Sequence, residues 1–336
     1  MTSLSSSRTT RATMVDVAKR AAVSVKTVSR VVNGEEGVRP DTKARVDEAI
    51  RQLGFRRNDS ASDLRRGRAE GIGLIVENMS DPFYSVIGAA VERVARLQRH
   101  LLLMGSAEGS AERERDLTGA FLSRRVAGLI VVPAIEDHHW LAAELAAGTP
   151  VVFVDRPASG LSADAVLTDN DAGVRSAVEH LAARGHRNIG FLGDNPEFWT
   201  AGQRLAAFGS ATAALGLRSD LTAMGPHEVE GIAALVETWT RDSDPVTALV
   251  TGNNRLSVTA LRALRRVGKR LALVGFDDFE LADMVEPAVT VVAQDPAAMG
   301  EQAAHLLFRR LAGEGGPART VVLPTRLVVR DSSHLV

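Results

Sequence analysis

The sequence contains no cysteine and no apolar run long enough to cross a bilayer. The lack of cysteine excludes a disulfide framework and a thiolate metal site, and it favours a cytoplasmic protein. The beginning of the chain, MTSLSSSRTTRAT, lacks the apolar core of a secretory signal, so residues 1–12 are expected to form a disordered tail. With 336 residues, 45% of them apolar, the chain is long enough for two or three globular units.

Signature motifs of several enzyme classes are also missing. The sequence has no Walker phosphate loop, no G-x-S-x-G elbow and no H-E-x-x-H pair. The adjacent His138 and His139 would diverge by about 100° on a helix, which does not suit one metal ion. We therefore expect no catalytic residue, no cofactor and no metal.

Charge is unevenly distributed along the chain. Residues 1–70 contain 15 Lys or Arg and 9 Asp or Glu, a net charge of +6, whereas the other 266 residues contain 25 and 32, a net charge of −7. A basic amino-terminal part on an acidic body predicts a polyanionic partner for the small part alone.

Two short helices are predicted near the amino end. Thr13 and Asp16 form a capping-box pattern that starts a helix over 14–21, and Ser24 is a good cap for a second helix over 25–32. The apolar residues of both helices face each other. The polar side chains left outside this seam are Lys26, Thr27, Ser29 and Arg30. Two helices joined by a three-residue turn are typical of a helix-turn-helix, whose second helix can enter a DNA major groove.

A third helix is predicted after these two. Pro40 suits its first turn and Gly54 its end. Its apolar stripe recurs with helical spacing at Val46, Ala49, Ile50 and Leu53. The alternative is a small helical bundle whose charged face is only solvated.

The rest of the chain alternates short apolar runs with helical patterns. The runs are GIGLIV (71–76), HLLLM (100–104), AGLIVV (127–132), PVVFVD (150–155), NIGFL (188–192), VTALVT (246–251) and LALVGF (271–276). This alternation predicts parallel sheets covered by helices on both faces, in two doubly wound subdomains. Such sheets bind small molecules at the carboxyl ends of their strands.

Several blocks resemble the LacI/GalR family of bacterial transcription regulators. They are MVDVAKRAAVSVKTVSRVVNG (14–34), the segment 155–194 that begins DRPASG and ends GFLGD, VTALVTGNN (246–254) and LVGFDD (273–278). The blocks occur in the family's order over nearly the whole chain. The resemblance implies a small all-α helix-turn-helix domain followed by a two-lobed, α/β periplasmic-binding-protein-like domain.

The resemblance also implies domain boundaries. The chain is expected to cross between the two lobes near residues 168, 293 and 325. The expected parts are a helix-turn-helix domain at 13–58, a hinge helix or linker at 59–70, and an effector-binding domain at 71–336, with lobe 1 at about 71–167 plus 294–324 and lobe 2 at about 168–293 plus 325–336.

The segment NDSASDLRRGRAEG (58–71) has the polar, basic composition of a linker. By resemblance, it holds a short hinge helix in which Leu64 wedges into the minor groove, and Arg65 adds a phosphate contact. A helix this short is marginal in water without DNA.

By resemblance, the second helix carries the residues that read DNA. Lys26 can donate to guanine, Val25 can offer an apolar contact to a thymine methyl, and Arg30 falls on a base-facing position. Lys26 could instead be a solvated surface lysine. Residues interpreted as phosphate contacts are Ser24, Thr27 and Asn33, with Ser29 open between the two roles.

The resemblance further implies an effector site between the lobes. Arg204, Asn253 and Asp277 match polar effector contacts, and together they can bind a polyol. The sequence departs from the family pattern at Asn254, where Asp is common. Aromatic residues that could stack on a sugar, or could be core, are Phe83, Tyr84, Phe198 and Trp199.

These features predict a ligand-responsive DNA-binding regulator, most simply a repressor, that binds a pseudo-palindromic operator as a homodimer. The resemblance makes helix 83–96 the dimer helix, although its apolar stripe could face the local sheet. No heptad tail follows the last strand, which favours a dimer over a tetramer. The effector is expected to be a sugar or derivative, acting as inducer or corepressor. The alternative is a cytosolic sugar-binding or sugar-modifying protein with a helical protein-interaction domain. A nucleoid-associated, cytoplasmic location without membrane contact is expected.

Overall fold

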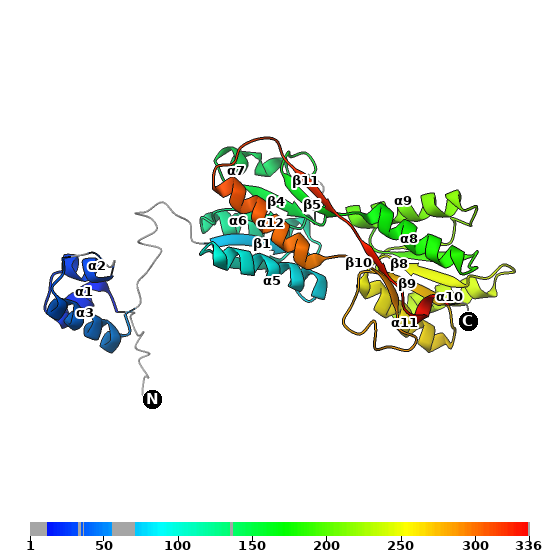
Figure 1. Ribbon diagram of the computed structural model, residues 1–336, viewed down its shortest axis with the longest axis horizontal. Helices are drawn as coiled ribbons and strands as arrows, with labels where there is room; N and C mark the ends of the chain where they lie inside the picture. Colours follow the sequence, from blue (N-terminus) through cyan, green and yellow to red (C-terminus); the bar gives the residue numbers. More distant parts are fainter. Residues whose placement is uncertain (1–11, 33–34, 36, 56–70, 135–136, 335–336) are drawn as a thin grey trace, which may run out of the picture. The chain divides into compact units, whose positions relative to one another are not determined.

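The computed structural model describes residues 12–32, 35, 37–55, 71–134 and 137–334 (Figure 1). The chain divides after Arg68 into two compact units, a helical head and a larger α/β body. The predicted hinge segment with Leu64 and Arg65 lies outside the described residues, as does Asn33. The predicted fold class, a helix-turn-helix followed by two parallel α/β lobes, is confirmed.

The helices of the head begin where the sequence predicts. They are α1 (Met14–Ala21), α2 (Val25–Val32) and α3 (Pro40–Leu53). The Thr13 hydroxyl accepts a hydrogen bond from the backbone N–H of Asp16 at 3.3 Å, and the Asp16 carboxylate accepts from the Thr13 N–H at 2.8 Å. The Ser24 hydroxyl accepts from the N–H of Thr27 at 3.1 Å. Local capping therefore starts both helices of the helix-turn-helix.

The head has a small core between its three helices. Its buried residues are Val17, Ala18, Ala21, Val28, Val46 and Ala49. Leu53, predicted on the buried stripe, is 36% exposed, so that prediction is wrong. Gly54 adopts a left-handed conformation (φ 59°) that ends α3 and turns the chain back. Phe55 consequently packs against the core beyond the end of the helix.

Lobe 1 of the body is a six-stranded, all-parallel sheet. Its strand order is β11 (Thr320–Leu323), β5 (Asp164–Thr168), β4 (Val151–Val154), β3 (Leu129–Val131), β1 (Gly71–Val76) and β2 (Leu101–Ser106). One face packs against α5 (Pro82–Leu97) and α12 (Pro296–Leu311), which lie side by side in Figure 1. The other face packs against α6 (Ala111–Ser123), the 3₁₀ turn η1 (His139–Leu141) and α7 (Ala142–Ala146).

Lobe 2 repeats this arrangement. Its strand order is β12 (Arg326–Val328), β10 (Thr290–Ala293), β9 (Ala272–Phe276), β8 (Ala248–Thr251), β6 (Ile189–Gly193) and β7 (Thr222–Met224). All neighbouring strands are parallel except β10 and β12. One face packs against α8 (Asn170–Ala183) and α9 (Trp199–Ala214), the other against α10 (Val229–Arg241) and α11 (Asn254–Val267). The 3₁₀ turn η2 (Asp331–Ser333) lies against β9 and β10.

The chain passes between the two sheets three times. It leaves lobe 1 after β5, returns after β10, and leaves again between β11 and β12. Five strands, β5, β7, β10, β11 and β12, were absent from the sequence-based runs. They have only three to five residues, and β7, β11 and β12 are half-buried or exposed edge strands, so no long apolar run marks them.

Candidate functional site

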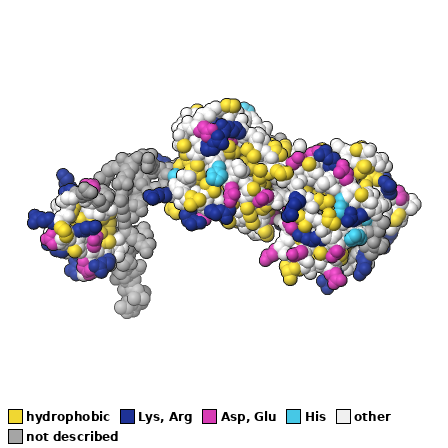
Figure 2. Space-filling view, in the orientation of Figure 1, with side chains coloured by type: hydrophobic (Ala, Val, Ile, Leu, Met, Phe, Trp, Pro, Cys, Tyr) yellow, Lys and Arg dark blue, Asp and Glu magenta, His cyan; other side chains and the backbone are white. Residues whose placement is uncertain are grey.

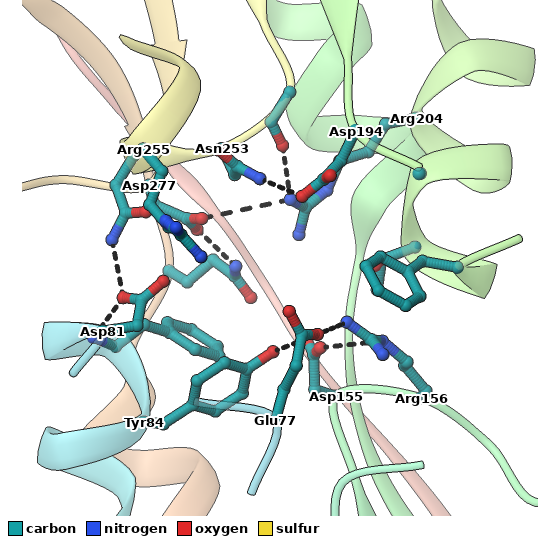
Figure 3. A pocket seen from close by; sticks show the side chains of 17 residues that line it. Glu77, Asp81, Tyr84, Asp155, Arg156, Asp194, Arg204, Asn253, Arg255 and Asp277 are labelled. Carbon is teal, nitrogen blue, oxygen red and sulfur yellow. Dashed lines mark hydrogen bonds and ion pairs between the residues drawn. The ribbon is translucent and has the colours of Figure 1, made fainter. Parts of the chain in front are cut away.

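A small polar cavity, partly open to solvent, lies where strands of both lobes end at their carboxyl ends (Figure 3). We call this cavity the cleft. It is lined by Glu77, Asp81, Phe83, Tyr84, Asp155, Arg156, Asp194, Phe198, Thr200, Ala201, Arg204, Gly252, Asn253, Asn254, Arg255, Asp277 and Gln294. The carboxyl edge of a parallel sheet is the expected position for a ligand.

Arg204 is held on the lobe 2 side of the cleft. It lies on α9 and is only 5% exposed. Its Nε donates to Asn170 Oδ1 at 2.7 Å, and its Nη1 donates to the carbonyl of Gly252 at 2.6 Å and lies 3.9 Å from Asp277 Oδ2. The guanidinium carbon stacks 3.8 Å from the centre of the Phe276 ring. These contacts fix the guanidinium plane before any ligand binds.

Asp277 follows β9 and links Arg204 to the segment that joins the lobes. Gln294 donates to Asp277 and accepts from the hydroxyl of Thr168, so residues that flank two of the crossings are hydrogen-bonded together. Burial raises the pKa of Asp277, and the Arg204 charge opposes that shift. A carboxylate placed here can accept hydrogen bonds from ligand hydroxyl groups.

Lobe 1 contributes a second ionic cluster. Arg156 donates to Glu77 and, at 2.9 Å, to the carbonyl of Pro133, and its Nε lies 3.6 Å from Asp155 Oδ2. The hydroxyl of Tyr84 donates to Glu77 at 3.2 Å, and burial raises the pKa of Tyr84 well above its usual value. The side chains of this cluster are therefore held in place by one another, and they form the polar lobe 1 side of the cleft.

The two lobes also touch across the cleft. Asn254 of α11 donates to Asp81 Oδ1 of lobe 1 at 2.9 Å. The Arg156 guanidinium lies 4.3 Å from the ring centre of Phe198 on lobe 2. Trp199 packs against the lobe 1 core rather than lining the cleft, so of the two alternatives that the sequence left open for it, core or cleft wall, the structure shows the core. It follows α9's cap, Phe198, and points across to lobe 1.

Burial of Asp155 has a testable consequence. Desolvation outweighs the nearby arginines and raises its pKa from 3.8 to about 6. A raised pKa means that this group favours the folded state at low pH, and that this contribution is lost as the pH rises from about 4 through about 6. We expect Asp155→Asn to raise the free energy of unfolding at pH 7.5 by about 1–3 kcal/mol, with the gain shrinking as the pH falls from about 6 to about 4.

Urea unfolding at several pH values measures this effect. Asparagine tolerates the left-handed backbone found here (φ 69°), so backbone strain does not obscure the result. A variant less stable than wild type at pH 7.5 would show instead that the contact with Arg156 dominates.

Six of the predicted effector residues line the cleft together. They are Phe83, Tyr84, Phe198, Arg204, Asn253 and Asp277. Tyr84 is 6% exposed and its hydroxyl donates a hydrogen bond to Glu77, so it offers little polar surface to a ligand. Asn253 caps α11 and donates to Asp194 at 2.6 Å.

Sequence reasoning missed part of the lining. The missed residues with charged or amide side chains are Glu77, Asp81, Asp155, Arg156, Asp194, Asn254, Arg255 and Gln294. Glu77 directly follows the predicted run 71–76, and Asp155 ends the run 150–155. Asp277 was predicted from the family resemblance, whereas the position of ligands at the carboxyl ends of strands would have found Glu77 and Asp155.

The second helix of the head exposes the predicted DNA-reading residues. Val25 is 42% exposed and Lys26 is exposed, while Arg30 pairs with Glu35 at 3.4 Å. Ser24 and Thr27 share a hydrogen bond of 2.8 Å between their hydroxyl groups, and Ser29 is half-buried. Figure 2 shows Lys and Arg side chains spread over the head. This surface can bind a polyanion, which agrees with the net positive charge of residues 1–70.

The described residues show no other chemical centre. No group of three or more His, Asp or Glu side chains among them is arranged to hold a metal ion. His138 is fully buried, and its Nε2 lies 3.0 Å from Glu114 Oε1. The other carboxylate oxygen of Glu114, Oε2, accepts a hydrogen bond from the N–H of Ala134 at 2.6 Å. Every helix in the described ranges is too short or too polar to span a membrane.

Comparison with known proteins identifies the family. Residues 13–58 match the model of bacterial regulatory proteins of the lacI family, and residues 178–333 match a periplasmic binding protein-like domain. The HTH-type transcriptional regulator CelR of Thermobifida fusca is 33% identical over 97% of this chain and 99% of its own.

Solved structures agree with this match. A lac repressor dimer bound to operator and the anti-inducer ONPF superposes with a TM-score of 0.83 at 25% identity, covering 97% of this chain and 100% of that one. A CelR–cellobiose complex superposes with a TM-score of 0.69 at 29% identity, covering 96% and 100%. The relatives are regulators rather than enzymes, and this chain belongs to the lacI family of DNA-binding transcriptional regulators.

Proposed function

We propose that the protein is a repressor whose operator affinity changes when a sugar or sugar derivative binds in the cleft. The observation that carries this proposal is the convergence of a guanidinium, an amide and a carboxylate, from Arg204, Asn253 and Asp277, at the carboxyl edge of lobe 2. Such a set matches the hydroxyl and ring oxygens of a polyol. The relative CelR, solved with cellobiose, supports this class of ligand.

The same cleft gives a physical route from ligand to operator. A ligand that contacts both lobes favours one lobe arrangement by its difference in affinity for the two. The chain crosses between the lobes at three segments, about which the angle between the lobes can change. Lobe 1 begins directly after the segment 59–70, which connects it to the head, so a movement of lobe 1 is passed to this segment. The proposed boundaries are those that the sequence predicts, with a head at 13–58 and a hinge at 59–70.

The head is proposed to read a pseudo-palindromic operator as part of a homodimer, as the lac repressor dimer does with its own operator. Residues assigned to base contacts are Val25, Lys26 and Arg30. Residues assigned to backbone or minor-groove contacts are Ser24, Thr27, Ser29, Asn33, Leu64 and Arg65. A protein with this role acts at the nucleoid in the cytoplasm.

Selection of binding sequences from a random duplex library tests the DNA half of the proposal. Enrichment of a two-fold symmetric site, with half-sites about one or two turns apart, supports it. Recovery of no preferred sequence would contradict it. A thermal-shift screen with sugars tests the other half, because a ligand at about 100 times its Kd adds roughly 2.7 kcal/mol of stability.

Lys26→Ala tests base reading in the same selection. We expect the variant to lose preference at one symmetric base position of each half-site, at a cost of about 1–3 kcal/mol for the wild-type operator. Lys43→Ala is the matched control, since Lys43 is an exposed lysine on α3 rather than on the second helix. Uniformly weaker binding with unchanged preference would make Lys26 a phosphate contact.

A further inference from the structure

The lining of the cleft carries more carboxyl groups than guanidinium groups. The carboxyl groups are those of Glu77, Asp81, Asp155, Asp194 and Asp277, and the guanidinium groups are those of Arg156, Arg204 and Arg255. Although burial raises the pKa of Asp155 to about 6, this group is still ionised at pH 7.5. An anionic ligand would therefore enter a site whose own charge is already negative.

The protein itself already holds the Arg204 guanidinium on two sides. Nε is bonded to Asn170, and Nη1 is bonded to the carbonyl of Gly252 and lies near Asp277. The Asp277 carboxylate offsets the charge of this guanidinium, so a phosphate or carboxylate gains less from it than from an unpaired arginine. Nη2 can donate to a hydroxyl or ring oxygen of a ligand.

The charge of Arg156 is offset in the same way. Its Nη1 donates to Pro133, its Nη2 donates to Glu77, its Nε lies 3.6 Å from Asp155, and its plane lies over Phe198. The residue is 5% exposed. Two acids of lobe 1 therefore balance this charge before any ligand binds.

Arg255 differs from these two because it is exposed at the first turn of α11. A charge at a solvent-exposed position is screened by water and salt and contributes little to binding. Farther inside, the carboxylates of Asp155, Asp194 and Asp277 face the same space in Figure 3. Carboxylates accept hydrogen bonds from hydroxyl and ammonium groups, and they repel phosphates and acids.

We infer that the cleft accepts an uncharged or amino-bearing carbohydrate and discriminates against sugar phosphates and sugar acids. This inference rests on the proposed function and narrows its ligand class. The discrimination comes from two features of the cleft. The charges of Arg156 and Arg204 are already offset by carboxylates, and the lining carries more carboxyl than guanidinium groups. It therefore does not depend on which neutral sugar fits best.

Matched sets of sugars on the full-length protein test the inference. Glucose, glucosamine, gluconate and glucose 6-phosphate form one set, and cellobiose and cellobionate form another, with inorganic phosphate measured alongside. Thermal shift and titration calorimetry at pH 7.5 are run on wild type, Asp194→Asn and Asp171→Asn. Asp171 is the control, because it is an exposed carboxylate on α8 outside the cleft and pairs with Arg175.

We expect a neutral or amino sugar to bind at least tenfold more tightly than its anionic counterpart, with a gap that narrows in Asp194→Asn but not in Asp171→Asn. An anionic member that binds as tightly as its neutral counterpart overturns the inference. If no sugar binds, the proposed sugar response fails, and inorganic phosphate decides the inference. A phosphate-induced stabilisation that appears or grows only in Asp194→Asn supports it, because removing one carboxylate then relieves the repulsion of an anion, whereas an equal stabilisation of all three proteins overturns it.

Discussion

Arg204→Ala is expected to abolish the response of operator binding to a cleft ligand and to lower the free energy of unfolding by about 3–5 kcal/mol. The loss is large because the side chain is buried and bonded on two sides. Its removal leaves Asn170 Oδ1 and the Gly252 carbonyl without this donor, and it leaves the Asp277 carboxylate without its ion-pair partner. Buried acceptors without a partner each cost free energy, and a buried charge costs more.

Urea unfolding and operator titrations, each with and without the sugar panel, measure both effects. Arg255→Ala is the control, because it removes an exposed arginine from the same cleft, and we expect it to unfold like wild type. Arg204→Lys keeps the charge but loses the planar guanidinium. If the alanine variant does not fold, the lysine variant still tests whether the guanidinium geometry is required. A normal response in Arg204→Lys would show that this geometry is not required.

The head could be predicted almost completely from the sequence because its signals are local. Thr13 with Asp16, Ser24 and Gly54 each act on backbone groups within a few residues of themselves. Leu53 was placed wrongly because a helical stripe does not tell where the partner helices end. The chain reverses at Gly54, and Phe55 takes the position against the core that the stripe had given to Leu53.

The cleft could be predicted only in part because its members meet through the fold. The family resemblance identified Asp277, and the strand ends of β1 and β4 would have added Glu77 and Asp155. The partners of Arg156 come from positions 77, 133 and 155, and no spacing in the sequence brings them together. Trp199 shows that proximity to the cleft in the sequence is not sufficient either, because this aromatic residue of lobe 2 packs into the core of lobe 1.

The repeated strand order of the two lobes explains why the carboxylates face each other. Asp155 follows β4 and Asp277 follows β9, which hold the same place in their sheets. Both residues adopt a left-handed backbone, with φ of 69° and 68°, and both donate their N–H to the next strand of their sheet. The cleft is therefore built from equivalent strand ends of the two lobes, and each lobe supplies its own guanidinium, Arg156 or Arg204.

Asn254→Asp is expected to weaken the junction of the lobes and to lower the free energy of unfolding of the body by about 2–3 kcal/mol at pH 7.5. Asn254 is 5% exposed, and its amide donates across the cleft to Asp81 at 2.9 Å. An aspartate there would bring two carboxylates together in a poorly hydrated place. The destabilisation should fade as the pH falls toward about 4, because one carboxyl group then takes up a proton.

A charge swap separates this repulsion from other effects of the substitution. Asp81→Asn combined with Asn254→Asp restores an amide–carboxylate pair with the roles reversed, and asparagine at 81 still caps α5. Aspartate in the first turn of α11 is favoured by the helix dipole, so the helix itself does not explain a loss. We expect the double variant to recover most of the stability in a double-mutant cycle measured by urea unfolding. If the double variant is no more stable than Asn254→Asp alone, this hydrogen bond does not hold the lobes together.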